Sequence, residues 1–431
     1  MAFASSTWLT RTSTLEGMPI KTTAPFVPLI LGGDIGAYSL AREFHEEYGV
    51  HSVAIPSVMT GLLAHSRIVE ARVFAEQDNE AAFLDFVEAQ ARELSLEGTR
   101  PVLLLASNDP HTRMIVAARG RLGRWAVIPY ADLDQLLAVT SKDGFDELCA
   151  LEGVPTPATA VVRAGDDVAA AVSAAGVEYP AIVKAADSVA WHDIEFAGQK
   201  KVHTVASAEE LTRLLASAAA AGYTDALVVQ DFIPGPDSGM HLVTLFADNA
   251  GKVRFAAAGR VLVEEHAPGA LGNSAAIISG AYPEIVATAK RVLEGLDWRG
   301  FAMFDLKFDP RDGSYRFFEL NPRLGRNHFY VSAAGNNVAR FYVEEFLRGG
   351  LLQEAEFIAA SNQHLYSVLP APLLRRYVPA ELKDTVNRLL RRGGHSHPLV
   401  YRAETDPRRW WYIGLSLVNQ YRKFKRWHPA P

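Results

Sequence analysis

The sequence has almost no cysteine, no long apolar run and no excess of positive charge, and each of these shortages excludes a class of protein. A single cysteine, Cys149, rules out a disulfide framework within one chain and suits a reducing cytoplasm. No uninterrupted apolar run approaches the ~20 residues that a membrane-spanning helix needs. The net charge of −6 argues against nucleic acid as the main partner, because duplex binding normally requires a basic surface.

The chain is long enough for several domains. Its 431 residues, of which 49% are hydrophobic and 21% charged, suit two or three globular domains with buried cores. Residues 1–24 are rich in serine and threonine and lack the basic start and apolar block of a secretory signal. We expect them to form a mobile arm, and we expect Cys149 to pack in the core.

A parallel α/β domain is predicted for residues 25–130, because apolar runs alternate there with helical patterns. The expected elements are a strand over 26–31, a helix over 37–48, a strand over 51–55, a helix over 80–94 and strands over 101–106 and 125–129. The turn Gly32-Gly33-Asp34-Ile35-Gly36 lacks the full dinucleotide-binding spacing. We expect it to present backbone N–H groups to a carboxylate or phosphate.

The pattern changes after residue 130. We expect a small α+β subdomain over 131–232, a larger antiparallel region over 233–350 and a C-terminal extension over 351–431. The small subdomain is predicted to hold helices over 142–152, 166–175 and 207–221 and strands over 158–163, 181–184 and 226–230. The predicted fold class is therefore α/β in the first part of the chain and α+β in the rest.

The strongest chemical signal is a hairpin that carries carboxylates. Its strands are Phe304-Asp305-Leu306-Lys307-Phe308 and Phe317-Phe318-Glu319-Leu320-Asn321. Because strand side chains alternate between faces, Asp305 shares a face with Lys307, and Glu319 shares one with Asn321, opposite Phe318 and Leu320. Asp305, Glu319 and Asn321 can then meet as an all-oxygen cluster suited to Mg²⁺. The alternative is a solvated hairpin face with ordinary charges.

Residues elsewhere in the chain strengthen the functional interpretation. Lys184 ends an apolar strand, where a lysine is unusual unless it meets an anion, and Lys142 lies near the start of an earlier helix. The segment Val228-Val-Gln-Asp-Phe-Ile-Pro-Gly235 has the pattern of a strand that runs into a hinge, and Arg323 follows the carboxylate hairpin. In this order, the motifs resemble the ATP-grasp superfamily over residues 130–350, and the first domain is similar to the partner domain that this family usually carries.

The resemblance implies an activity and a set of site residues. The implied activity is ATP-dependent joining of a carboxylate to an amine through an acyl-phosphate, with release of ADP and phosphate. The residues implied to contact ATP are Lys142 and Lys184, at the phosphates, and Gln230, Asp231, Phe232 and Ile233, of which the last three are implied to hold adenine through their backbone. The implied ligands of Mg²⁺, or of Mn²⁺ in its place, are Asp305, Glu319 and Asn321. The residues implied to hold the transferred phosphoryl group or the acyl-phosphate are Arg323 and Arg326. Asp231 departs from the family, which more often has glutamate there.

Softer motifs indicate a subgroup and its substrates. The stretches Ile128-Pro-Tyr-Ala-Asp132, Gly198-Gln-Lys-Lys-Val202 and His266-Ala-Pro-Gly-Ala-Leu-Gly-Asn-Ser274 resemble the D-aspartate ligase group, which joins the β-carboxylate of D-aspartate to an amine of a peptidoglycan precursor. The implied partners are a small amino acid and an amine acceptor. The residues expected to face them are Arg260, His266, Asn273 and Ser274. Another amino-acid or dipeptide ligase, an ATP-binding module without turnover, and a homodimer all stay open, whereas no His/Cys spacing suggests zinc.

The end of the chain carries a basic, aromatic helical pattern. Its apolar stripe is predicted to consist of Trp410, Leu417, Val418, Tyr421 and Phe424. Its basic residues fall mostly elsewhere: Arg422, Lys423, Lys425 and Arg426. Either the stripe docks on the protein's own core, or the helix lies on an anionic membrane surface. The expected location is the cytoplasm, with the inner face of the membrane as the second alternative.

Overall fold

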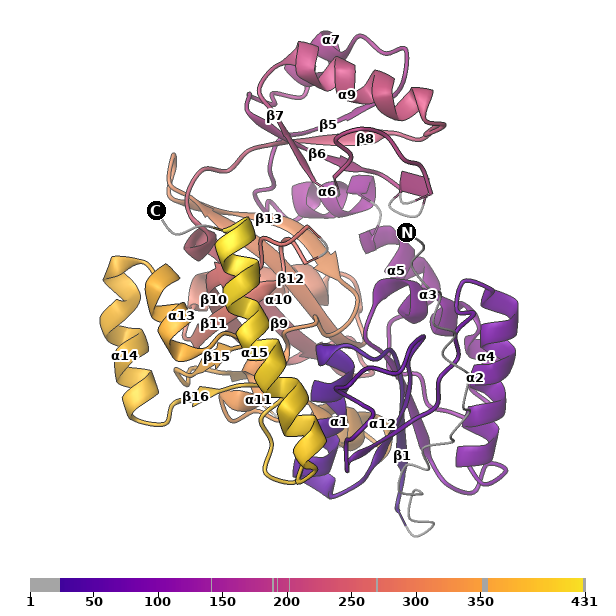
Figure 1. Ribbon diagram of the computed structural model, residues 1–431. Helices are drawn as coiled ribbons and strands as arrows, with labels where there is room; N and C mark the ends of the chain where they lie inside the picture. The colour runs from indigo at the N-terminus through magenta and orange to yellow at the C-terminus, as the bar shows by residue number, and fades with distance from the viewer. Residues whose placement is uncertain are drawn as a thin grey trace, which may run out of the picture.

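The computed structural model places most of the chain in three β-sheets with their helices (Figure 1). The described residues are 24–140, 142–187, 190–191, 193–200, 202–268, 270–350 and 356–428, and the side chains of Lys142 and Asp143 are also outside this set. All but the last residue of the predicted N-terminal arm therefore lies outside the described residues.

The N-terminal sheet is parallel, as predicted. Its strand order is β3-β2-β1-β4, and every pair of neighbours in it is parallel. Its strands and helices are β1 (Val27–Leu31), α1 (Ile35–Tyr48), β2 (Ser52–Ile55), β3 (Val69–Ala71), α2 (Glu80–Leu94), β4 (Val102–Ala106), α3 (Asp109–Ala117) and α4 (Arg119–Leu122). Strands β1, β2 and β4 are buried along their whole length, as expected for a parallel sheet covered by helices.

The strand predicted over 125–129 is wrong. The segment pairs with the sheet only at the single bridge between Leu103 and Val127. Beyond it, Pro129 has no backbone N–H to donate to a ladder. The guanidinium of Arg119 instead donates hydrogen bonds to the carbonyl oxygens of Ile128 and Tyr130, at 2.9 and 2.8 Å. A side chain has therefore replaced a neighbouring strand as the partner of this backbone.

A small antiparallel sheet follows in the chain, with strand order β5-β8-β6-β7. Its elements are β5 (Thr159–Val162), α7 (Val168–Ala174), β6 (Ala181–Ala185), β7 (His203–Val205), α9 (Ala208–Ala220) and β8 (Leu227–Asp231). Figure 1 shows α7 and α9 on its outer side, away from the rest of the molecule. Helices α5 (Leu133–Thr140) and α6 (Lys142–Leu151) lead into it, and Cys149 of α6 is fully buried, as expected.

The largest sheet has the order β13-β12-β9-β10-β11-β15-β16, and β14 pairs with β10. Its strands are β9 (Met240–Ala247), β10 (Val253–Glu264), β11 (Ser274–Gly280), β12 (Gly300–Asp309), β13 (Ser314–Asn321), β14 (Ile358–Ala359), β15 (Leu365–Ser367) and β16 (His395–Ser396). Its helical elements are the 3-10 turn η1 (Asp237–Gly239), α10 (Pro283–Glu294), α11 (Phe329–Ala333) and α12 (Val338–Phe346). Strands from the C-terminal extension thus complete one side of this sheet.

Both faces of the large sheet are covered, and β9 shows how. Val243 and Leu245 belong to the same hydrophobic cluster as α10. Leu242 and Phe246 point to the opposite face, where Phe246 packs at 5.5 Å from Phe341 of α12. Because side chains alternate along a strand, β9 contributes to a separate hydrophobic core on each face of the sheet.

Three helices and a short 3-10 turn end the chain: α13 (Ala371–Tyr377), η2 (Ala380–Leu382), α14 (Lys383–Arg391) and α15 (Pro407–Trp427). The predicted apolar stripe of α15 is partly wrong, because Trp410, Val418 and Tyr421 are exposed. The buried face consists of Arg409, Ile413, Gln420 and Phe424, with Leu417 half-buried. Two polar residues occupy this face, which an apolar pattern alone does not reveal.

Candidate functional site

The hairpin of β12 and β13 brings the three predicted metal ligands together. Asp305 and Glu319 are directly opposite in the antiparallel ladder, and Asn321 is opposite Met303. The Nδ2 atom of Asn321 donates to Oδ2 of Asp305 at 2.9 Å. The carboxylate cluster expected from the alternation of side chains is therefore present.

A bulge corrects one detail of that hairpin. Leu306 pairs with Phe317 and Asp305 with Glu319, so Phe318 is an extra residue in β13. As a result Phe317, not Phe318, shares the buried face with Leu320. The bulge keeps Glu319 opposite Asp305 while Phe317 and Leu320 stay in the core and Phe318 is half-buried.

The electrostatics of this cluster fit a cation. Burial, together with the neighbouring carboxylate of Glu319, raises the pKa of Asp305 well above its usual range. A divalent ion would relieve this repulsion, and carboxylate and amide oxygens are ligands that Mg²⁺ accepts. The donor set of Asp305, Glu319 and Asn321 is therefore suited to Mg²⁺.

The segment predicted to hold adenine is fastened to the same hairpin. The Nζ atom of Lys307 donates to the carbonyls of Ile233 and Gly235 at 2.8 and 3.2 Å and lies 5.5 Å from the ring centre of Phe232. The guanidinium of Arg311 donates to Asp231 at 2.6 Å. Lys307 and Arg311 thus set the distance between the linker after β8 and the carboxylate cluster. Gln230, one residue earlier, is buried and donates to Thr159 at 3.3 Å.

The two predicted phosphate-binding lysines differ in what the structure describes. Lys184 lies on β6, facing the large sheet closely enough for its charge to act on Glu264. Lys142 begins α6, but its side chain is outside the described set. Burial, and next the charge of Asp237, raises the pKa of Glu264 to about 7. Glu264 also acts on Asp305 and Lys307, so it belongs to the same electrostatic site.

Both predicted arginines meet carboxylates of the N-terminal domain. Nε of Arg323 lies 2.8 Å from Oδ1 of Asp109, and its NH2 group donates to Oδ2 at 2.9 Å. Arg326 lies farther from its partner, with 3.8 Å between its Nε and Oδ2 of Asp34. Asp34 and Asp109 follow β1 and β4, at the carboxyl edge where ligands of open α/β sheets bind. The site therefore lies between the N-terminal parallel sheet and the large antiparallel sheet.

The predicted glycine turn allows this approach. A Cβ on Gly36 would lie 3.2 Å from Cα of Arg326, which is tighter than most Cβ contacts, so a glycine favours this close approach of the start of α1. Gly32 has φ +129°, and a Cβ there would meet the side chain of Ser107 at 2.1 Å. The turn is thus a close-approach turn, and its neighbour is the loop that carries both arginines.

The four residues expected to face substrates divide into two pairs. Arg260 and His266 reach the η1 segment: Nε of Arg260 donates to Ser238 O at 2.7 Å, and Nε2 of His266 lies 2.9 Å from Oδ2 of Asp237. Asn273 and Ser274 make local contacts instead. The Nδ2 atom of Asn273 donates to Ala270 O at 2.9 Å, and Ser274 is a buried residue of β11 paired with β10.

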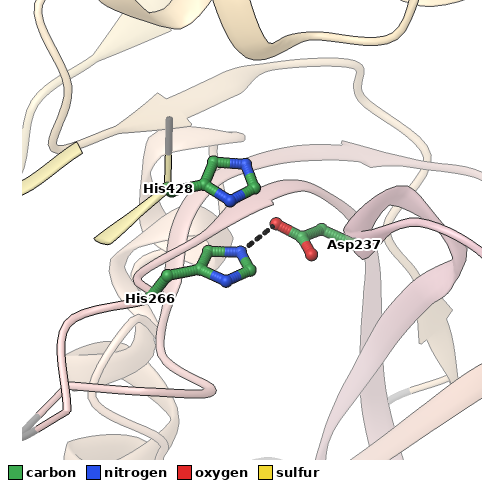
Figure 2. Close-up of side chains that lie close together, drawn as sticks. All are labelled: Asp237, His266 and His428. Carbon is green, nitrogen blue, oxygen red and sulfur yellow. Dashed lines mark hydrogen bonds and ion pairs between the residues drawn. The ribbon is translucent and has the colours of Figure 1, made fainter. Parts of the chain in front are cut away.

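The end of α15 joins this cluster (Figure 2). His428 stacks on His266 with ring centres 3.8 Å apart and planes 15° apart. Potential ligand atoms of Asp237, His266 and His428 lie within 4.8 Å of one another. Lone pairs of nearly parallel rings do not converge on one point, however, and the hydrogen bond to Asp237 raises the pKa of His266 while burial lowers that of His428. The hydrogen bond between His266 and Asp237, with the ring of His428 stacked on that of His266, accounts for this contact.

Several of these residues were missed from the sequence. Asp34 and Asp109 had a usable signal, because each follows a buried strand of a parallel sheet. Glu264 is the last residue of the mostly apolar strand β10, just as Lys184 lies near the end of the apolar strand β6. A charged residue at the end of an apolar strand was therefore a usable signal for Glu264 as well. His428 gave no signal, since it is distant in the chain from Asp237 and His266.

The chain is similar in sequence to known proteins. The family described as carbamoyl-phosphate synthase L chain, ATP binding domain, matches residues 142–343. A D-aspartate ligase of Enterococcus faecium (strain Aus0004) is 30% identical over 408 residues, which cover 93% of this chain and 96% of that protein.

Two solved structures share the fold. One is an L-amino acid ligase from Bacillus licheniformis, with a TM-score of 0.51 and 16% identity over 78% of this chain and 76% of that one. The other is the biotin carboxylase domain of the Hydrogenobacter thermophilus 2-oxoglutarate carboxylase, with a TM-score of 0.56 and 16% identity over 76% of this chain and 71% of that one. The predicted fold, with its N-terminal parallel sheet and helical C-terminal stretch, is confirmed. The chain belongs to the ATP-grasp superfamily of carboxylate–amine ligases.

Proposed function

We propose that this ligase joins the β-carboxylate of D-aspartate to a side-chain amine of a peptidoglycan precursor. The observation that carries this choice is the 30% identity to D-aspartate ligase along 93% of the chain. The reaction would use ATP and release ADP and phosphate. Mg²⁺ would lie among Asp305, Glu319 and Asn321, where it would neutralise charge on the phosphates during transfer.

The charges between the N-terminal sheet and the large sheet support a zwitterionic dicarboxylic substrate. Arg323 and Arg326 supply positive charge for carboxylates, and Asp34 and Asp109 supply negative charge for an ammonium group. Because Asp34 is 3.8 Å from Arg326, that pair is open enough for a substrate to insert its own charges between them. A small amino acid with three charged groups would satisfy such a surface.

The chemistry needs positioning more than a nucleophilic side chain. A carboxylate oxygen of the amino acid attacks the γ-phosphorus of ATP, the bond to ADP breaks, and an acyl-phosphate forms. The acceptor amine then attacks the acyl carbon, phosphate leaves, and the amine loses a proton as the amide forms. Lys184 and Arg323 would neutralise the charge of the transferred group, which is the main requirement of such a reaction.

The test is ATP-dependent phosphate release with single amino acids, with and without a precursor that carries the amine. We expect release to require D-aspartate and the precursor together and to disappear in Glu319→Gln. Glu178→Gln, which removes an exposed carboxylate outside the site, should keep full activity. Release with another amino acid would discard D-aspartate, and no release with any pair despite ATP binding would discard turnover.

A further inference from the structure

The outward face of α15 exposes large apolar side chains in a continuous row. Trp411 is 71% exposed, Leu415 51% and Val418 55%. Their spacing of four and three residues places them on one face of the helix. Tyr421 and Trp427 are also exposed farther along. We call Trp411, Leu415, Val418 and the basic residues Arg422, Lys425 and Arg426 the α15 face.

The charge of this face has one sign. Helix α15 contains no aspartate or glutamate between Pro407 and Trp427. Arg422 and Lys425 are exposed and make no ion pair with any described residue, and Arg426 lies over the ring of Trp427 at 4.7 Å. Residues 356–428 hold thirteen basic and five acidic side chains, an excess of eight positive charges in a chain of net charge −6.

The inner side of α15 packs against the rest of the protein. The apolar residues on its outward face are therefore exposed although the helix is fixed in place. Arg409 is fully buried, with its guanidinium 4.3 Å from the ring centre of Tyr38 and its Nε 3.3 Å from Glu404. Glu404 in turn accepts from the hydroxyl of Tyr38 at 3.0 Å. At the other end, Phe424 packs at 4.9 Å from Tyr377. Both ends of α15 are therefore anchored, with the apolar row facing solvent.

The position of the helix makes the face accessible. Figure 1 shows α15 lying diagonally along the molecule, starting beside α1 of the N-terminal domain. Toward its other end, Nζ of Lys423 lies 3.4 Å from Oε2 of Glu265, which follows β10. No helix among the described residues is long and apolar enough to cross a membrane, α15 included. A helix that is anchored along one side and apolar on the other can lie along the surface of a membrane.

We propose that the α15 face docks on the anionic surface of a lipid bilayer. Aliphatic side chains and tryptophan rings settle at the level of the headgroups, and arginine and lysine pair with anionic lipids. A second copy of this chain fits less well, because a two-fold contact would bring together two helices that carry positive charge and no negative charge. This proposal does not depend on which amino acid the enzyme uses.

The experiment is sedimentation of the full chain with vesicles of phosphatidylcholine alone or mixed with phosphatidylglycerol. We expect binding to the mixed vesicles only, weakened by salt. The variant R422Q/K425Q/R426Q should lose about a hundredfold in partitioning, since each basic residue near the surface contributes several-fold. The variant W411S/L415S/V418S should lose binding as well. A control, R163Q/R213Q/K252Q, removes three exposed charges elsewhere and should bind as the unaltered chain does.

Other outcomes would overturn the proposal. They are equal binding to both kinds of vesicle, no binding to either, or unchanged binding by the two α15 variants. A dimer in light scattering that W411S/L415S/V418S converts to a monomer, without vesicle binding, would identify the face as a contact between copies. Each variant should keep the melting temperature and phosphate release of the unaltered enzyme, because no substituted residue lies in the site. A large fall in melting temperature would show that the face is structural and contradict the proposal.

Discussion

Nε of Arg323 lies 2.8 Å from Oδ1 of Asp109, so an arginine that follows the carboxylate hairpin is held by the N-terminal domain. The two residues come from parts of the chain that are 214 positions apart. This contact fixes where positive charge is presented at the edge of the parallel sheet. It also means that the position of Arg323 depends on the packing of both domains.

Arg323 and Asp109 should therefore differ in their effect on catalysis. Arg323→Lys should lower kcat by about a hundredfold, because a lysine cannot keep both contacts and also meet a phosphoryl group. Asp109→Asn should cost about tenfold, since it loosens the guanidinium without removing it. Steady-state phosphate release measures both, with Arg113→Lys on the exposed side of α3 as control. Equal activity of Arg323→Lys and the control would remove Arg323 from the reaction.

Removing the charge of Asp305 should have opposite effects on the stability of the metal-free protein and on its affinity for metal. The raised pKa of Asp305 means that its charged form destabilises the metal-free fold, so this penalty is absent at low pH and grows as pH rises through the folded-state pKa. Asp305→Asn should therefore raise the melting temperature in EDTA at neutral pH. The same variant should weaken the stabilisation by Mg²⁺ and ADP, lowering apparent affinity at least about tenfold. A lower melting temperature in EDTA would contradict this account.

Acid sensitivity should come in part from His241. Burial lowers its pKa to about 4, and it lies between the rings of Tyr282 and Tyr315 at 5.2 and 5.1 Å. Because the folded-state pKa is depressed, its contribution is present above pH ~6.5 and is lost as pH falls toward 4. His241→Asn should flatten the pH dependence of the free energy of unfolding by about 3 kcal/mol across this window. Denaturant unfolding at several pH values measures it, and the exposed His395→Gln should leave the slope unchanged.

The start of α1 should be sensitive to a single methyl group. In Gly36→Ala the new Cβ would lie 3.2 Å from Cα of Arg326, so the loop with both arginines must shift by a few tenths of an ångström. We expect kcat/KM to fall about tenfold and the stability to fall by about 1 kcal/mol. Gly120→Ala is the matched control, because nothing lies within 4 Å of its Cβ position. Similar kinetics of the two variants would mean that the approach of α1 does not set the position of Arg326.

Local patterns predicted much of this structure, and long-range partners limited the rest. Helix α2 has its predicted bounds, and Asp305 and Glu319 are opposite each other because a hairpin needs only neighbouring residues to pair. The buried Arg409 was unpredictable, since its partner Glu404 and the ring of Tyr38 become neighbours only in the folded chain. The bulge at Phe318 likewise depends on which side chains the core admits. Residue types and spacing thus indicated the chemistry, whereas packing decided which groups complete the site.

The most direct test of the central claim follows the oxygen atoms of the substrate. With an amino acid whose reacting carboxylate carries ¹⁸O, formation of an acyl-phosphate predicts that one ¹⁸O per turnover appears in the released phosphate, measured by mass spectrometry. The phosphate takes this atom because the carboxylate oxygen attacks phosphorus and leaves with it when the amine forms the amide. Phosphate that carries only the oxygens of ATP and water, despite amide formation, would contradict a ligase that activates its carboxylate by phosphorylation.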